Sequence, residues 1–82
     1  MSKMQTKKGV NFEAEMWRYM KMRGVSSKEK LRLLTTIGSH GTIVNYFDNP
    51  ELIPMGKLSE MMTALRIPKE DRARIINMLI EQ

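Results

Sequence analysis

The stretch "TIGSHGTIVNYFDNP", residues 36–50, places short apolar pairs among small and polar side chains. Ser39 is a favourable N-cap, and Ile43 and Phe47 lie one helical turn apart. The Asn-Pro pair that follows is a typical helix stop, because proline cannot continue a helix. The pattern predicts a short helix over 39–47 whose first turn and outer face are polar. A buried helix would not carry so many polar positions, so this face is either bare in water or in contact with a partner.

Four further helices are predicted from apolar residues that recur at helical spacing on both sides of this segment. Their expected spans are Asn11 to Gly24, Ser27 to about Thr36, Pro54 to about Leu65, and Pro68 to about Ile80. The clearest stripes are Phe12, Met16, Tyr19 and Met20 in the first helix and Leu58, Met61, Met62 and Leu65 in the fourth. No segment shows the sustained alternation of a strand. We therefore expect an all-α fold, a compact bundle of about five short helices.

Length and composition limit the functions that this chain can have. Its 82 residues suffice for one domain, which we divide into a flexible basic N-terminal arm over 1–10 and a helical domain over 11–82. There is no Cys, His40 is the single histidine, and no apolar run approaches the roughly 18 to 20 residues of a membrane span. No nucleophile and base pair, phosphate-binding glycine loop or metal-ligand spacing is present. We expect a soluble cytoplasmic protein that is not an enzyme and uses no cofactor and no metal.

Charge gives the first functional indication, because the 14 basic and nine acidic side chains are unevenly distributed. Residues 1–32 carry nine basic and three acidic side chains, a net charge of +6, whereas residues 33–82 carry five and six, a net charge of −1. A positive field concentrated at one end favours anionic partners such as nucleic acid or an acidic protein surface. The alternative is that the positive charge serves only the solubility of the chain.

The predicted second and third helices, joined by a turn that contains Gly38, form the frame of a helix-turn-helix. Within that frame the run Ser39, His40, Gly41, Thr42, Ile43 and the segments "YFDNP" and "KLSEMMTALRIP" are similar to the lambda-repressor-like, Cro-type DNA-binding domain. Residues 12–80 resemble its small phage and mobile-element members in the order and spacing of elements. The second helix departs from the family pattern, with Lys28 where Gln is typical and about one extra residue near Gly38.

The resemblance implies a transcriptional regulator or repressor that binds double-stranded DNA as a homodimer, with helix 39–47 in the major groove. The base contacts it implies are His40, Gly41, Thr42 and Asn45, and the phosphate contacts are Ser27, Lys28, Ser39 and Lys57. The N-terminal arm would add Lys3, Lys7 and Lys8. Each assignment has a plainer alternative: the serines are ordinary N-caps, the polar face is solvated, and the arm is a basic tail.

A second hypothesis is a helical protein-interaction module, such as a phage-encoded inhibitor or adaptor, built on a helix-turn-helix frame. The altered second helix motivates it, as does the width of the apolar face of the first helix, where Trp17 lies off the main stripe. Trp17, together with Ile76 and Ile80 of the fifth helix, either completes the core or belongs to a dimer or partner surface.

Overall fold

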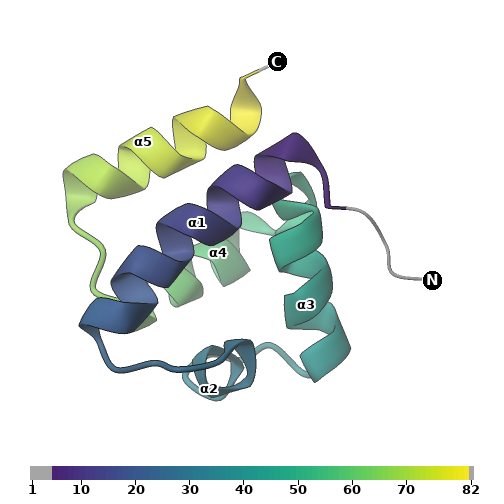
Figure 1. Ribbon diagram of the computed structural model, residues 1–82, viewed down its shortest axis with the longest axis vertical. Helices are drawn as coiled ribbons and strands as arrows, with labels where there is room; N and C mark the ends of the chain where they lie inside the picture. The colour runs from purple at the N-terminus through teal and green to yellow at the C-terminus, as the bar shows by residue number, and fades with distance from the viewer. Residues whose placement is uncertain (1–4, 82) are drawn as a thin grey trace.

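The chain folds into five α-helices and one short 3-10 helix in a computed structural model, which describes residues 5–81 (Figure 1). The elements are α1 (Lys7–Met22), α2 (Lys28–Arg32), α3 (His40–Asp48), η1 (Pro50–Leu52), α4 (Met55–Ala64) and α5 (Lys69–Ile80). No β-strand occurs between residues 5 and 81. The predicted all-α fold of five short helices is therefore confirmed.

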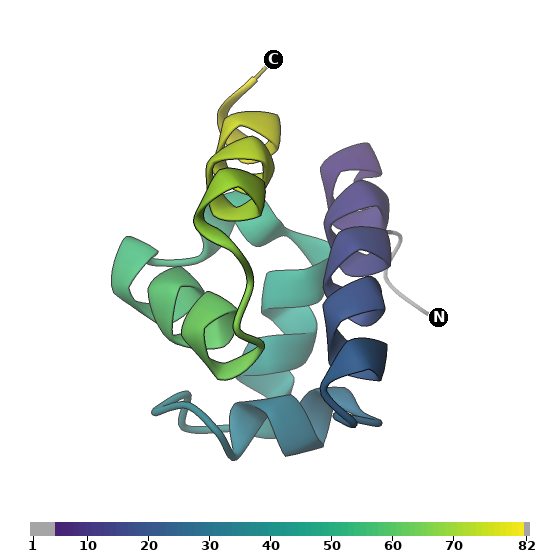
Figure 2. The same ribbon diagram turned by 90° about the vertical axis from the view of Figure 1, so that its left-hand side faces the viewer.

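The two views show how the helices are arranged around one core (Figures 1 and 2). α1 and α5 run beside each other, and α3 packs against the first half of α1. α2 lies across the end of the bundle where α1 ends and α3 begins, in contact with α3 and α4. One side of α3 therefore faces the core and the other faces outward.

The core is built from the apolar stripes that the sequence indicated. Phe12 and Phe47 meet edge to face with their ring centroids 5.5 Å apart, which joins α1 to α3. The four stripe residues of the first helix and the four of the fourth are all buried, as predicted. In α5 the core takes Ile75 and Leu79, whereas Ile80 is exposed.

The N-cap of the first helix lies five residues earlier than the sequence predicted. Thr6, not Asn11, is the N-cap: its hydroxyl accepts a hydrogen bond from the Gly9 amide at 3.0 Å and lies 3.2 Å from the Asp48 carbonyl oxygen, to which it donates. That contact anchors the start of α1 to the end of α3, so the helix extends through Lys7–Met22. The predicted flexible arm over 1–10 is consequently wrong for residues 7–10, while residues 1–4 lie outside the part that the structure describes.

The second helix is shorter than predicted, ending at Arg32 rather than near Thr36. The Arg32 side chain donates to the Ile37 carbonyl oxygen at 3.1 Å, and the Thr35 hydroxyl donates to the Arg32 carbonyl oxygen at 2.8 Å. These bonds turn the chain so that Ile37 enters the core, which a continued helix would prevent. The connection to α3 spans residues 33–39, which is longer than the tight turn expected for a helix-turn-helix.

Candidate nucleic-acid interface

The third helix presents a small, polar face away from the core. Ile43 is fully buried, and Gly41 and Asn45 each lie two positions from it, about 200° around the helix. Gly41 is exposed, while Thr42 and Asn45 are half-buried. The sequence predicted these three residues as base contacts, and the structure does bring them together on one outward surface, which we call the α3 face.

His40 begins α3 but points back to α2. Its Nδ1 lies 3.0 Å from Glu29 Oε1, and the same carboxylate receives a hydrogen bond of 2.8 Å from Arg32 Nε. The Arg32 guanidinium, with His40 in support, lowers the pKa of Glu29 to about 2. An ionised carboxylate therefore stands beside the first turn of α3, and His40 is engaged by it rather than aligned with the α3 face.

Glu29 was not among the residues that the sequence singled out. Its spacing of three residues from Arg32 could have predicted the ion pair between them, because residues three apart are neighbours on a helix. The approach of His40 depends on how α2 and α3 pack, and no local pattern reports that.

Both serines predicted as phosphate contacts act as helix caps. Ser27 Oγ accepts a hydrogen bond from the Lys30 amide at 3.1 Å, and Ser39 Oγ accepts one from the Thr42 amide at 3.2 Å. The Ser39 hydroxyl also lies 2.8 Å from the Thr42 hydroxyl, so the two side chains order each other at the start of α3. Capping is the plainer of the two roles considered for them, and it fixes where each helix begins.

Lys28 is engaged inside the fold. Its Nζ lies 3.4 Å from Glu13 Oε2 and 4.9 Å above the centre of the Phe47 ring. Partial burial acts to raise the pKa of Glu13, but hydrogen bonds from Trp17 and Gln5 and the nearby Lys28 charge outweigh it, so that the pKa is lowered. Lys28 thus contacts both α1 and α3, and the phosphate contact predicted for it would have to compete with Glu13.

Lys57 also has a partner within the chain. Its ammonium donates to the Thr36 hydroxyl and lies 3.7 Å from Glu60 Oε2, while the Glu60 carboxylate accepts the Thr36 backbone amide at 2.6 Å. This network ties the connection between α2 and α3 to α4. Lys57 is only partly exposed, and its predicted contact with phosphate would have to compete with this network.

The described part of the predicted basic arm lies away from the first turn of α3. Lys3 lies outside the described residues, Lys7 is exposed on the first turn of α1, and Lys8 donates to the Leu79 carbonyl oxygen of α5 at 2.9 Å. The start of α1 lies beside the end of α3, where the Thr6 amide reaches the Asp48 carbonyl oxygen. Lys7 and Lys8 are therefore at the opposite end of α3 from His40.

The residues predicted as a dimer or partner surface separate into two places. Trp17 Nε1 donates to Glu13 Oε2 at 3.1 Å, and the ring borders a shallow hollow near the end of α1. Ile76 and Ile80 line a different hollow, between η1 and the start of α4, where Met55 is a neighbour. Trp17 and the two isoleucines therefore border two different hollows.

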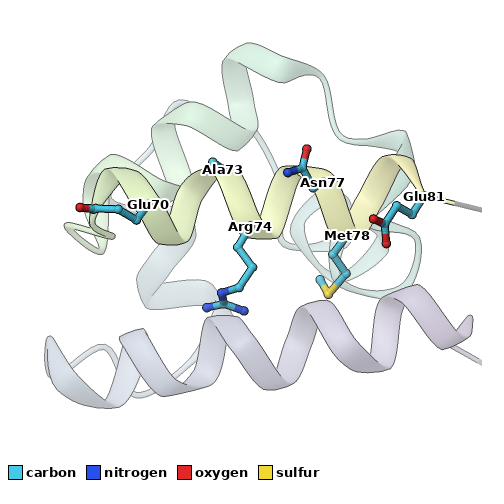
Figure 3. A pocket seen from close by; sticks show the side chains of 6 residues that line it. All are labelled: Glu70, Ala73, Arg74, Asn77, Met78 and Glu81. Atoms are coloured by element: carbon cyan, nitrogen blue, oxygen red, sulfur yellow. The ribbon is translucent and has the colours of Figure 1, made fainter.

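A third hollow, on α5, lies along the contact between α5 and α1. Figure 3 shows Arg74 and Met78 pointing from α5 toward α1. Arg74 Nη1 lies 2.8 Å from Glu15 Oε2, and this hydrogen bond is the main cause that lowers the pKa of Glu15. The contact holds α5 against α1.

The cations that remain without an acidic partner lie mostly away from the α3 face. α3 itself contains no Lys or Arg, and α2 contributes Lys30, which is exposed and forms no ion pair with residues 5–81. Lys21, Arg23 and Arg66 cluster instead at the ends of α1 and α4. The basic end that the sequence indicated thus contributes little charge to the α3 face.

No protein-family model, curated protein or solved structure matches this chain. Across residues 5–81 no group of His, Cys, Asp and Glu side chains is arranged to hold a metal ion. None of the helices described here is both long and apolar enough to cross a membrane.

Proposed function

We propose that this protein is a sequence-specific DNA-binding transcriptional regulator of the phage or mobile-element type, with α3 inserted in the major groove. The observation that carries the proposal is the α3 face, where Gly41, Thr42 and Asn45 lie together on the outward side of a short helix. An outward helix face of small, hydrogen-bonding side chains is what a base-reading element requires.

The dimensions and chemistry of α3 suit that role. An α-helix with its side chains is about 10–12 Å in diameter, and the major groove is about 12 Å wide. The Asn45 amide has the donor and acceptor needed for adenine N6 and N7, and Thr42 offers a hydroxyl to a base edge or a methyl to thymine. Gly41 has no side chain, which allows the helix backbone to come close to the base pairs.

Phosphate contacts would come from a small set of cations. Lys30 on α2 is exposed beside α3, and Lys57 is partly exposed across the connection from it. The ionised Glu29 repels phosphate near the first turn of α3, so the affinity of one domain for DNA is expected to be low. Specific binding by this chain would therefore depend on two copies acting together.

A homodimer supplies the second copy. Two half-sites about 34 Å apart, one helical turn of DNA, convert the second binding event into an intramolecular one. The exposed apolar side chains around the hollow between η1, α4 and α5 are suited to this contact: Leu52 is 63% exposed, Met55 61% and Ile80 67%. We place the dimer contact there.

The protein-interaction module is the second candidate function, and one observation favours it. Leu33 and Leu34, which follow α2 directly, are 66% and 57% exposed, where a DNA-facing turn would be expected to be polar. On this hypothesis the chain keeps the helical frame and binds another protein.

Salt dependence distinguishes the two functions. Binding of the purified protein to a fluorescent duplex pool would be measured by anisotropy between 50 and about 200 mM salt. Contacts to phosphates predict that the logarithm of the association constant falls linearly with the logarithm of salt concentration. A binding signal without such a slope, or no binding at the lowest salt, would contradict the DNA function.

A further inference from the structure

The helices α1 and α4 end in the same backbone motif. In α1 the Val25 amide donates to the Met20 carbonyl oxygen at 2.9 Å, and in α4 the Ile67 amide donates to the Met62 carbonyl oxygen at 3.0 Å. Such a six-to-one bond defines a Schellman ending, in which the residue just past the C-cap adopts a left-handed conformation. Val25 and Ile67 are both buried, so each motif returns the chain to the core.

The left-handed position is filled differently in the two motifs. It is Gly24 in the motif after α1, with φ of 72°, and Arg66 in the motif after α4, with φ of 53°. Glycine adopts this conformation without a steric cost, whereas a residue with a side chain does so at a cost of order 1 kcal/mol. Arg66 is also the one non-glycine residue with positive φ in the part of the chain described. Its side chain is exposed, so packing in the core does not account for it.

Arg66 borders a groove that combines apolar and basic side chains. Met22 and Leu34, which are 64% and 57% exposed, line the groove together with Ala64, and Arg23 and Arg66 flank them. Val25 also forms part of the lining, and it borders the neighbouring hollow as well, where Trp17 and Lys21 lie. We call this continuous surface, formed by the ends of α1 and α4 and the segment after α2, the basic groove.

The charges of the basic groove are of one sign. Arg23 donates to the Leu65 and Arg66 carbonyl oxygens at 2.8 and 3.2 Å, which holds its guanidinium at the edge of the groove. Among residues 5–81, no carboxylate forms an ion pair with Lys21, Arg23 or Arg66. Apolar side chains in a hollow rimmed only by cations are complementary to a ligand with apolar residues flanked by carboxylates.

We propose that the basic groove binds an acidic amphipathic helical segment of a partner protein. Met22, Leu34 and Ala64 would receive the apolar side chains of that segment, while Lys21, Arg23 and Arg66 would pair with its Glu or Asp residues. A nucleic-acid backbone would satisfy the cations but leave Met22 and Leu34 uncovered, so a protein segment fits this surface better. The basic groove shares no residue with the α3 face.

The test uses the full chain labelled with ¹⁵N and a synthetic peptide of about four helical turns, with Leu at spacings of three and four residues and Glu elsewhere. Titration of the peptide should shift amide signals in segments 20–25, 33–37 and 62–67, and leave α3 unchanged. A control peptide with Gln in place of Glu should bind at least about fivefold more weakly, because it lacks the charges. Shifts elsewhere, or equal affinity for the two peptides, would overturn the proposal.

The variant Arg66→Gly separates binding from folding. Glycine relieves the left-handed strain, so the variant should be more stable than the parent yet bind the peptide about threefold to fivefold more weakly. The control variant Lys30→Ala loses one positive charge outside the groove, so it should bind the peptide as tightly as the parent does. If Arg66→Gly binds with unchanged affinity, or if a random duplex displaces the peptide from the same amides, the groove is not a docking site for an acidic helix.

Discussion

Gly9 of α1 and Asp48 at the end of α3 are in backbone contact. A Cβ atom added at Gly9 would lie 2.3 Å from the Asp48 carbonyl oxygen. Non-bonded carbon and oxygen atoms do not come this close, so one of the two backbones would have to move. The Thr6 hydroxyl donates to that same oxygen. This contact sets how closely α1 and α3 cross.

Replacement of Gly9 by Ala should destabilise the protein. Alanine improves helix propensity by about 0.5–1 kcal/mol, but the added Cβ clashes with backbone, and such overpacking should cost about 1–3 kcal/mol or more. The matched control is Gly56→Ala in α4, where nothing lies within 4 Å of the added Cβ. Urea denaturation of both variants checks this, and equal stabilisation by the two substitutions would show that the α1–α3 contact is looser than described.

Gly41→Ala should separate stability from DNA binding. Nothing lies within 4 Å of a Cβ added at Gly41, so alanine should stabilise α3 by about 0.5–1 kcal/mol. If α3 lies in the major groove, the same methyl group stands between the helix and the bases and should weaken specific binding. Thermal unfolding, and anisotropy with a duplex selected from a random pool, would be measured on the same preparation. An unchanged affinity for that duplex would place the DNA contact elsewhere.

The interaction of Glu29 with Arg32 and His40 should make stability depend on acid pH. The pKa of Glu29 is about 2 in the folded protein, below its ordinary value of 4.5, so the unfolded chain takes up the proton first as pH falls. The stabilisation from Glu29 is complete above about pH 5 and is lost between about pH 4.5 and 2. Glu29→Gln should therefore be less stable than the parent at pH 7, with a difference that narrows toward pH 2.

Arg32→Gln is the companion variant for this prediction, because it removes the same pair from the other side. It should show the same narrowing with acid, with an added loss at every pH since Arg32 also donates to the Ile37 carbonyl oxygen. Denaturant titrations at pH 7, 4 and about 2.5 provide the measurement. A stability difference that is constant across these pH values for Glu29→Gln would refute the role assigned to the carboxylate.

Asn45→Ala should weaken specific DNA binding by about 1–3 kcal/mol and relax the preference for one base pair. Lys30→Ala should instead weaken binding to all sequences alike and reduce the salt slope by about 1. Because Asn49 donates to Asn45 Oδ1 at 3.4 Å, the stability of the Asn45 variant would be measured alongside. A folded Asn45→Ala protein that binds its best duplex as tightly as the parent would eliminate this residue as a base contact.

Periodicity was sufficient to predict the helical class and most of the core. The stripe from Phe12 to Met20 and the stripe from Leu58 to Leu65 are buried as expected, because a repeat of 3.6 residues directly reports which face packs inward. The third helix was predicted to within one residue, since Ser39 supplies a strong local cap.

What the sequence did not predict depends on contacts between distant residues. Thr6 became the cap of α1 because the Asp48 carbonyl oxygen, 42 positions away, engages it. The end of α2 is set by Arg32 reaching Ile37, and Lys28 is drawn inward by Glu13. The sequence identifies Lys28 and Lys57 as cations that could contact phosphate. Only the packing reveals which carboxylates and hydroxyls within the chain already bind them.

The most direct test of the proposed function is selection from a random pool of duplexes at near-physiological salt. The purified protein would be incubated with the pool over several rounds, and the bound molecules sequenced. If α3 reads DNA, the pool should become enriched in a palindromic motif whose half-sites are about 34 Å apart, and Asn45→Ala should abolish that enrichment. A pool that remains as random as the input, with a folded protein, would contradict DNA binding by α3.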